Sequence, residues 1–579
     1  MATPKTRRDF LIAGTGVVAG AALGPVAADA LSRKRARFWA HPDLSRPRPD
    51  QLEALHVLGK HSLRMPGSRP FPQISEGTDM LPQIEHVVVV MMENHSYDNF
   101  LGMLGRGPFQ TPRGDGFQIA ADGYPANSNP FASGKPLRAF RMPTTCQFGG
   151  KPTQEWEQAH IQYANGTNQG FVVSGSGDVA MGYWDSQDLP FTYDLASTFP
   201  IGDRYFCSLL GQTDPNRRYL IAATSSGMTD DIPETTSDAT LPLPPGHGTI
   251  FNRLSTAGIS WNEYDVQTSA TGETLNLYPL SDYSYDHSNV KPIDDFFSDA
   301  AAGTLPQFCL VDPNFGTESQ ENPQNIIVGE AWLRTVVEAI GASPNWASTA
   351  LIINYDEHGG YYDHVPPPAA LAPDDVQPVV NPGQHIYDGF KRYGFRVPCI
   401  VVSPYAKRDY VSHLVYDHTS VCAFVEHKFN LAAMTLRDAN ANNMLDFLDL
   451  SALSAGQPTF PELPQLALSG STPQTLMCSK TGPGTVPAPA PKPLPVTVRI
   501  GAGHVSRGAY HVPIQASRQV TGVTVELLKD KKVVAKRSIS GLSVAVRTVS
   551  LRETRRGSYK LVVRAGNTEL GSRAVVIRS

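Results

Sequence analysis

The chain has 579 residues, 41% of them hydrophobic and 18% charged, which is ordinary for a globular protein and long enough for a large domain with a smaller one. Its six cysteines are widely spaced and form no CxxC motif, which argues against a zinc or iron–sulfur site. The formal net charge of −5 hides an asymmetry, because residues 496–579 carry 16 Lys/Arg against 4 Asp/Glu and leave about −17 for the residues before them.

The first 30 residues predict an export signal rather than part of the fold. A twin-arginine signature, Thr-Arg-Arg-Asp-Phe-Leu, occupies residues 6–11 and precedes a weakly apolar stretch rich in Gly and Ala. Residues 28–30, Ala-Asp-Ala, offer a cleavage site. We expect export by the twin-arginine route to the periplasm, the cell envelope or the medium. No other stretch of the sequence is long and apolar enough to span a bilayer.

Residues 31–480 predict one α/β unit. Short apolar strands are expected at 84–92, 307–311, 350–355 and 397–402, with helical patterns between them, for example at 329–340 and 419–429. Such an alternation predicts a mostly parallel sheet covered by helices on both faces. Residues 87–90 are four valines, whose β-branched side chains suit the buried middle of that sheet.

Polar side chains follow two of these strands. Glu93, Asn94, His95, Ser96 and Asp98 follow the first, and Asp356, Glu357 and His358 follow the strand at 350–355. In open α/β sheets ligands bind just past the carboxyl ends of the strands. Oxygen ligands that converge on one rim predict a hard divalent cation, which offsets the repulsion between carboxylates.

The C-terminal part has a different pattern. Residues 481–495 form a proline-rich linker, expected to be semi-rigid and extended. Beyond it, apolar residues alternate with polar ones, as at Val523, Val525 and Leu527, which predicts a small β-sandwich over residues 496–579. Its basic surface could contact an anionic membrane, cell-wall polymers or the acidic catalytic unit, or serve solubility alone. We expect no nucleic-acid partner.

Four separated motifs carry a family resemblance. They begin at Glu93, Thr213, Asp356 and Asp417 and read Glu-Asn-His-Ser-Tyr-Asp, Thr-Asp-Pro-Asn-Arg, Asp-Glu-His-Gly-Gly-Tyr-Tyr-Asp-His-Val-Pro and Asp-His-Thr-Ser. They resemble the secreted phosphoesterase family of bacterial phospholipases C and related acid phosphatases, within the alkaline-phosphatase-like superfamily. The resemblance covers residues 80–450. It implies an alkaline-phosphatase-like fold and a phosphoric ester hydrolase.

The resemblance also implies roles for single residues. In the family, the Glu-Asn pair and the Asp-Glu pair bind a divalent metal, and here they are Glu93, Asn94, Asp356 and Glu357. The metal, whose identity stays open, would polarise the phosphoryl group. Candidates for phosphate binding, leaving-group protonation or support of the metal ligands are His358, His364 and His418. Candidates for substrate positioning or for capping a loop are Asn216 and Arg217.

The sequence departs from the family pattern in three places. In the phospholipase C branch a threonine nucleophile precedes Met-Gly-Tyr, whereas this chain has Ala180 there, which cannot form a phosphoryl-enzyme intermediate. A histidine is expected shortly before Trp156, and the chain has Gln154 and Glu155. A Glu-His-Pro motif reads Glu-Asn-Pro at 321–323, which leaves Asn322 as a candidate for substrate binding.

Two routes could replace the missing nucleophile. The first uses the hydroxyl of Ser174 or Ser176, which lie in a Gly-rich loop close to Ala180. The second is direct attack by a metal-activated water, with Asp178, His160 or His358 removing the proton, and it is slightly favoured because it needs no missing side chain. His160 is also a candidate for contacting the substrate.

These observations predict an exported, metal-dependent phosphoesterase, acting on a phosphate ester such as a phospholipid headgroup bond. The nearest alternative is an acid phosphatase acting on small monoesters. A catalytically inert protein that binds the cell envelope through its basic sandwich is the alternative from another class. Ala180 supports that third hypothesis, and the retained acidic pairs oppose it.

Overall fold

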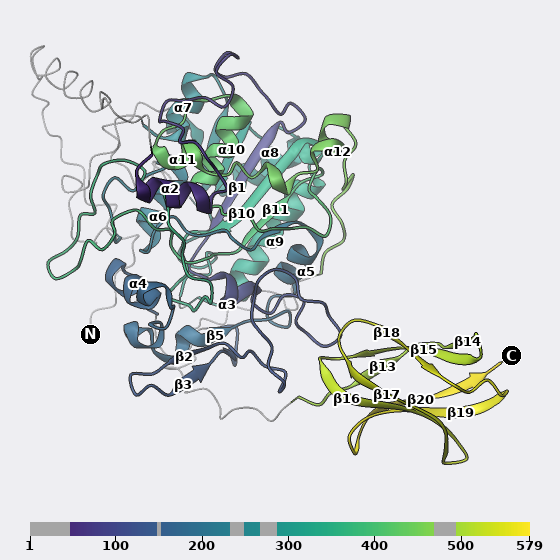
Figure 1. Ribbon diagram of the computed structural model, residues 1–579. Helices are drawn as coiled ribbons and strands as arrows, with labels where there is room; N and C mark the ends of the chain where they lie inside the picture. Colours follow the sequence, from purple (N-terminus) through teal and green to yellow (C-terminus); the bar gives the residue numbers. More distant parts are fainter. Residues whose placement is uncertain are drawn as a thin grey trace, which may run out of the picture.

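The computed structural model describes residues 47–146, 152–231, 248–266, 287–322, 324–467 and 494–578. The predicted export signal at 1–30 and residues 481–493 of the predicted linker lie outside the described residues. Figure 1 shows a large α/β unit with a separate all-β unit beside it, at whose outer end the C-terminus lies. Among the helices described, none is both long and apolar enough to cross a membrane.

An eight-stranded sheet forms the centre of the α/β unit, in the order β12-β6-β11-β10-β1-β9-β7-β8. Its strands are β1 (His86–Met92), β6 (Ile201–Gly202), β7 (Trp261–Asp265), β8 (Val290–Pro292), β9 (Phe308–Val311), β10 (Thr349–Tyr355), β11 (Cys399–Val402) and β12 (Val411–Ser412). Neighbouring strands are parallel except for β11, which runs antiparallel to β10 and β6. The mostly parallel sheet predicted from the sequence is therefore confirmed.

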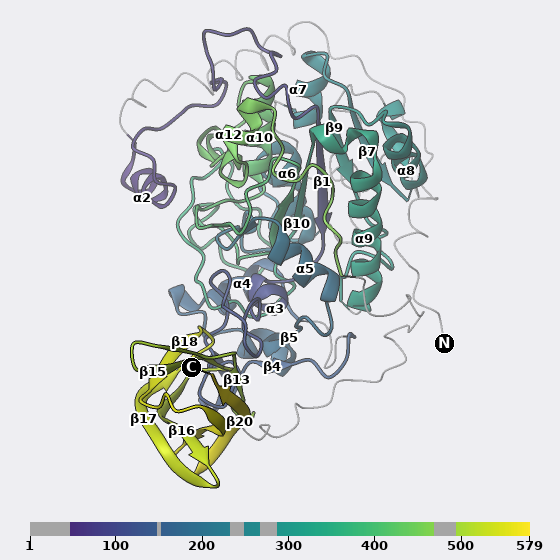
Figure 2. The ribbon, with the colours of Figure 1, turned by 90° about the vertical axis from the view of Figure 1, so that its right-hand side faces the viewer.

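Helices cover both faces of this sheet, as predicted, with α8 and α9 on one side and α6 and α10 on the other (Figure 2). The helices are α2 (Pro49–Val57), α3 (Tyr97–Leu101), α4 (Trp156–Tyr163), α5 (Pro190–Thr198), α6 (Thr213–Ala222), α7 (Ile250–Thr256), α8 (Ile293–Ala302), α9 (Ile326–Ala342), α10 (Thr419–Phe429), α11 (Leu436–Asn440) and α12 (Leu450–Ala455). The helical patterns at 329–340 and 419–429 correspond to α9 and α10.

Strand β1 is the central element of the core. All seven of its residues are buried, and the four valines at 87–90 are completely shielded from solvent. Burying one such side chain contributes about 2 kcal/mol, so this segment is strongly fixed in place. In the sheet register Met92 is paired with Tyr355 of β10, and Val90 with Val311 of β9. Three parallel strands therefore end at nearly the same level.

Loops and short elements extend the α/β unit beyond the ends of these strands. They include two small two-stranded sheets, β2 (Ser128–Pro130) with β3 (Pro136–Arg138), and β4 (Phe140–Arg141) with β5 (Gly182–Tyr183). Figure 1 places them with α3 and α4 at the end of the molecule to which β1 leads.

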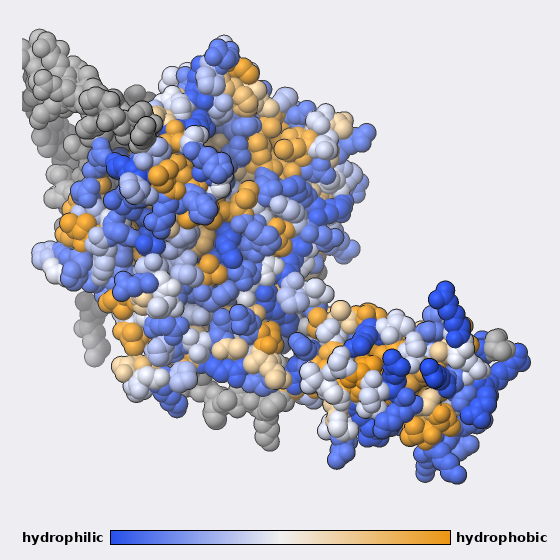
Figure 3. All heavy atoms as spheres, viewed as in Figure 1, coloured by the Kyte–Doolittle hydropathy of each residue, from blue (hydrophilic) through white to orange (hydrophobic). Residues whose placement is uncertain are grey.

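The C-terminal region is all β, as predicted. One four-stranded sheet contains β13 (Val498–Ile500), β14 (His504–Ser506), β15 (Ala509–Ala516) and β18 (Arg547–Leu551), and the other contains β16 (Val520–Lys529), β17 (Lys532–Leu542), β19 (Gly557–Ala565) and β20 (Thr568–Ile577). Alternate residues of β15 are buried. Buried side chains of both sheets form one hydrophobic core, which makes the region a sandwich. In the view of Figure 3 its surface mixes hydrophilic residues with white and orange patches.

Candidate active site

The ends of β1 and β10 bring the four predicted metal ligands together. The backbone N–H of Asn94 donates a hydrogen bond of 2.9 Å to Oδ1 of Asp356, and Asn94 adopts a left-handed φ of 65°. Gly359 packs against this turn so closely that a Cβ there would lie 1.9 Å from the carbonyl oxygen of Asn94. Glu93, Asn94, Asp356 and Glu357 are all buried. Register and turn geometry thus place both acidic pairs on one rim.

A third strand end adds Asp312, which directly follows β9 and is bound by Arg217 of α6. Arg217 Nη1 lies 3.1 Å from Asp312 Oδ1, and Nη2 donates to the carbonyl oxygen of Met91 at 3.0 Å. The guanidinium is also 3.8 Å from Glu93 Oε1 and from Asp356 Oδ2. Burial alone would lower the pKa of Arg217, but the surrounding carboxylates raise it. Arg217 is therefore a fixed cation inside the acidic cluster.

The donor set fits a hard divalent cation. Burial raises the pKa of Asp356 to about 7; Arg217 opposes this rise and repulsion from Glu357 adds to it. Oδ2 of Asp356 is buried and accepts no hydrogen bond from the described residues. The carboxylate of Glu357 repels that of Asp356, and burying like charges side by side is costly. A cation held by carboxylate and amide oxygens would relieve that cost.

His358 contacts this cluster, and Gln162 of α4 holds its ring from the other side. Nδ1 of His358 is 3.0 Å from Glu357 Oε2, and Nε2 is 2.6 Å from Gln162 Oε1. The Gln162 amide nitrogen donates to the carbonyl oxygen of Thr153 at 2.6 Å, so its oxygen faces the imidazole. Burial lowers the pKa of His358 to about 3. Gln162 was not anticipated, because no motif contains it.

The two serines considered as replacement nucleophiles, Ser174 and Ser176, lie next to the amide nitrogen of Gln162, whereas the amide oxygen of Gln162 contacts His358. Its amide nitrogen is 3.2 Å from Ser174 Oγ and 3.3 Å from Ser176 Oγ, and both hydroxyls also contact the Thr153 hydroxyl, at 3.0 and 2.9 Å. The side chains of Gln162 and His358 therefore stand between these hydroxyls and Glu357. This arrangement disfavours a serine as the attacking group.

His418 supports the backbone of the acidic rim. Its Nε2 donates a 2.6 Å hydrogen bond to the carbonyl oxygen of Asp356, and Nδ1 accepts from the hydroxyl of Tyr205 at 3.2 Å. Burial lowers the pKa of His418 to about 3, so the ring is neutral. Both ring nitrogens of His418 are engaged in hydrogen bonds. Of the roles predicted for it (phosphate binding, leaving-group protonation and support of the metal ligands), these contacts fit the last.

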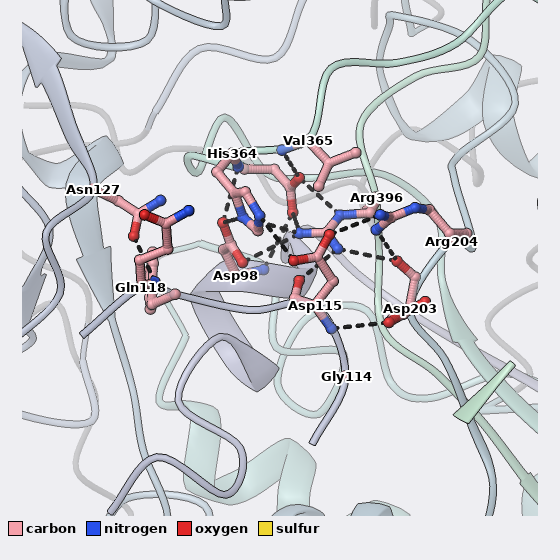
Figure 4. A network of polar contacts seen from close by, with 12 residues as sticks. Asp98, Gly114, Asp115, Gln118, Asn127, Asp203, Arg204, His364, Val365 and Arg396 are labelled. Carbon is pink, nitrogen blue, oxygen red and sulfur yellow. Dashed lines mark hydrogen bonds and ion pairs between the residues drawn. The ribbon is translucent and has the colours of Figure 1, made fainter. Parts of the chain in front are cut away.

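His364 belongs to a second polar centre, in which it meets Asp98 of α3, Asp115 and Arg396 (Figure 4). Nδ1 of His364 is 2.7 Å from Asp98 Oδ2, and Nε2 is 3.3 Å from Asp115 Oδ1. Burial opposes protonation, but the two carboxylates raise the pKa of His364 to about 10. The imidazolium is thus engaged by carboxylates on both sides.

A group with the spacing of metal ligands lies in this second centre. Asp98, Asp363 and His364 place ligand atoms within 4.8 Å of one another. The buried guanidinium of Arg396 already serves these carboxylates, with Nε 2.9 Å from Asp363 Oδ1 and Nη2 3.2 Å from Asp98 Oδ1. Both centres therefore combine carboxylates with a buried guanidinium, Arg396 here and Arg217 at the rim.

The other predicted site residues have different surroundings. Asn216 is buried, and its side-chain oxygen accepts hydrogen bonds from the backbone N–H groups of Ser208 and Leu209. These contacts match the role of capping a loop rather than that of positioning substrate. Asn322 accepts from the Tyr361 hydroxyl at 2.8 Å, next to the His95 ring that stacks on Tyr361.

His160 and Asp178 have no described contact with the acidic rim. The His160 ring stacks on Tyr387, with centroids 3.9 Å apart, and Nδ1 bonds the carbonyl oxygen of Trp156. Asp178 lies in the 3-10 turn Gly177–Met181. Ala180 of that turn is buried and accepts from the backbone N–H of Tyr362 at 2.9 Å, beside the loop that carries His358.

Comparison with known proteins agrees with these features. The model of the phosphoesterase family matches residues 84–432. Phospholipase C A of Mycobacterium tuberculosis is 29% identical over 491 residues, which cover 76% of this chain and 91% of that protein. Phospholipase C B of the same organism is 31% identical, and the match covers 67% of this chain and 80% of that protein. Non-specific phospholipase C1 of Arabidopsis thaliana is 29% identical, and the match covers 67% of this chain and 74% of that protein.

Among solved structures, a protein in the alkaline phosphatase superfamily from Vibrio parahaemolyticus is similar with a TM-score of 0.27 and 11% identity. The match covers 55% of this chain and 72% of that chain. This likeness is too low to carry an argument.

Proposed function

Because this chain belongs to the phosphoesterase family, we propose that it is an exported, metal-dependent phosphoesterase that cleaves phospholipid headgroups in the manner of a phospholipase C. The family and the class of phosphoric ester hydrolase, both predicted from four motifs, are confirmed. The observation that carries the proposal is the paired register of β1 and β10, which sets Glu93 and Asn94 beside Asp356 and Glu357.

Glu93, Asn94, Asp356 and Glu357 would hold the ion, and Arg217 and His418 would keep them in place. When bound, a divalent cation supplies electrophilic assistance by polarising the phosphoryl oxygen. Arg217 holds a permanent positive charge within 3.8 Å of Glu93 and Asp356, which limits the number of further charges that the rim accepts. Which metal occupies the rim is a question for experiment.

We infer that water attacks phosphorus directly, in one displacement that breaks the bond between phosphorus and the glycerol oxygen and releases diacylglycerol and the phosphorylated headgroup. Ala180 has no nucleophilic atom, and Ser174 and Ser176 are separated from Glu357 by Gln162 and His358. Of the three proton acceptors suggested by the sequence, His358 is the one in contact with the rim, 3.0 Å from Glu357. His160 and Asp178 have no such contact among the described residues.

The phospholipid substrate is proposed because several similar proteins are phospholipases C. Hydrolysis of small monoesters is the second candidate, because the same rim could polarise either kind of phosphoryl group. A catalytically inert, envelope-binding protein is the third candidate, and Ala180 is the observation that favours it. Export by the twin-arginine route belongs to the proposal and rests on residues 6–11 and 28–30.

The test is an assay of the purified full chain, stripped of metal and then supplied with magnesium, manganese, calcium or zinc in turn. Phosphatidylcholine, phosphatidylglycerol and p-nitrophenyl phosphate are offered as substrates. We expect metal-dependent release of a phosphorylated headgroup. Release of inorganic phosphate from the monoester alone would favour a phosphatase, and no release with any metal would favour the inert protein.

A further inference from the structure

The β-sandwich has an inner end, which contacts the α/β unit. The backbone N–H of Phe109 donates to the carbonyl oxygen of Ser517 at 3.3 Å, and that of Leu494 donates to Asp122 at 2.9 Å. The Gln515 side chain donates to the carbonyl oxygen of Phe109 at 3.2 Å, and the Arg499 guanidinium lies 4.3 Å from the centroid of the Phe109 ring.

The strand registers define the outer end. In β16, Val520 is paired with Leu542 near the inner end, whereas Lys529 is paired with Lys532 at the opposite hairpin. Loop 552–556 connects the end of β18 to the start of β19. The last residue of β18, Leu551, is paired with Tyr510 near the start of β15. The first residue of β19, Gly557, is paired with Ile577 at the end of β20. The turn at 507–508, the hairpin at 529–532, loop 552–556 and residue 578 therefore share the end that faces away from the α/β unit (Figure 1).

Basic residues are concentrated at this outer end. Its eight basic side chains, here called the basic tip, are Arg507, Lys529, Lys531, Lys532, Arg552, Arg555, Arg556 and Arg578, and its two acidic ones are Asp530 and Glu553. Arg518 is the one charged residue in the described loops of the inner end, at 494–497, 517–519, 543–546 and 566–567. Figure 3 shows a mostly hydrophilic outer end.

Protection of an exposed sheet edge explains only part of this distribution. Lysines on edge strands discourage pairing with another chain, and β17 is an edge strand. Arg507 and loop 552–556 lie outside β17, however, and come from the other sheet and the connection between the sheets. Basic residues from several separate loops meet at one end, as expected for a docking surface.

We propose that the basic tip docks on the surface of a bilayer rich in anionic phospholipids. Each lysine or arginine near such a surface strengthens binding, and the acidic remainder of the chain would turn away from it. Val533 is 49% exposed beside Lys532, which gives an apolar contact suited to the interfacial zone. The inference rests on the proposed function, because docking would hold the chain on the surface that contains its phospholipid substrate.

The test measures sedimentation of the full chain with vesicles of phosphatidylcholine alone or mixed with phosphatidylglycerol, at low and high salt. We expect binding that needs phosphatidylglycerol and weakens with salt, because exposed charges are screened. The variant K529Q/K531Q/K532Q should bind on the order of a hundredfold more weakly. R507Q/R552Q/R578Q, which changes exposed tip residues outside that hairpin, should lose a similar factor, and Arg555 is kept because it pairs with Glu553 at 2.8 Å.

The matched control is K536Q/K560Q/R564Q. It removes the same charge from ion pairs with Glu526 and Glu569 on the outer face of the second sheet, and should change binding by less than about threefold. Equal losses in the tip and control variants, binding without phosphatidylglycerol, or retention by anionic cell-wall polymer but not by vesicles would overturn the proposal. Hydrolysis of a soluble ester without vesicles reports on the rim alone, so failure of docking and failure of catalysis are distinguishable.

Discussion

The backbone N–H of Asn94 donates a 2.9 Å hydrogen bond to Oδ1 of Asp356, a residue 262 positions further along the chain. The bond exists because β1 and β10 are adjacent parallel strands that end together. It leaves Oδ2 of Asp356 buried and without a hydrogen bond from the described residues. The carboxylate is therefore oriented by one oxygen and available to a cation through the other.

Replacing Asp356 by Asn should separate metal binding from folding. We expect D356N to bind divalent cations at least about tenfold more weakly, because the amide carries no charge. The metal-free variant should unfold at a higher temperature than the metal-free wild type, because burial penalises the charged form of Asp356 and raises its pKa to about 7. Calorimetric titration and thermal unfolding in chelator measure the two effects.

The control for this prediction is D375N, which alters an exposed carboxylate away from the rim. It should change neither quantity. If D356N retained wild-type metal affinity, the rim would not be the metal site, and E93Q would be expected to retain it as well.

Arg217 should be essential for stability. It is buried and touches Asp312, Glu93 and Asp356, so R217M would leave buried carboxylates without their guanidinium. Breaking such an arrangement costs about 3–5 kcal/mol, measured as the free energy of unfolding in urea. The double variant R217M/D312N should recover part of the loss, because it also removes a carboxylate. Purely additive effects would show that the two side chains are not coupled.

The sequence anticipates these residues because strand ends and motifs are local signals. The valines at 87–90 predict a buried strand, and the polar residues after it mark the rim. Arg396 was not anticipated because it precedes a strand instead of following one. Since β11 is antiparallel to β10, the start of β11, and not its end, lies at the rim. Gln162 escaped notice because it meets His358 across 196 positions, a contact that only tertiary packing creates.

Gln162 should act as a positioning residue for His358. Its oxygen accepts from His358 Nε2 at 2.6 Å, which directs the other ring nitrogen toward Glu357. In Q162M this acceptor is lost, and we expect weaker metal binding and a changed nitrogen chemical shift of the His358 ring. Q162E keeps the acceptor and should restore much of the affinity. Q169M, at an exposed position on the same segment, is the control, and equal behaviour of Q162M and Q169M would contradict the role.

The ion network around His364 should give stability a specific pH dependence. The carboxylates of Asp98 and Asp115 raise the pKa of His364 to about 10, from 6.5 in an unfolded chain. The stabilisation is therefore fully present below about pH 6.5 and is lost as the pH rises through about 10. Each tenfold difference in proton affinity between the folded and the unfolded chain corresponds to about 1.4 kcal/mol.

The measurement is the free energy of unfolding at several pH values for the wild type and H364N. The asparagine variant should be less stable at pH 6, and the difference between the two proteins should shrink toward pH 10. A difference that stays constant over this range would mean that His364 stabilises the fold by packing alone.

Ala180 allows a direct test of the reaction path. Its backbone is fixed by the hydrogen bond from Tyr362, and its side chain is buried in the cluster that includes Phe171 and Met181. A180T adds a hydroxyl at the position where the resemblance expects the nucleophile, at a packing cost of about 1–3 kcal/mol. If the covalent path was lost with this side chain alone, A180T should gain phosphoesterase rate and form a phosphoryl-enzyme intermediate that acid quenching traps on the threonine.

The isosteric variant A180V distinguishes that outcome from a packing effect. Valine has the same shape as threonine and nearly the same volume, but no hydroxyl, so it should carry the same packing cost and form no covalent intermediate. A wild-type reaction by direct attack of water predicts a single burst-free phase for the wild type and A180V. A burst in the wild type would require a nucleophile other than residue 180, and would place Ser174, Ser176 and their contact with Gln162 back in the reaction path.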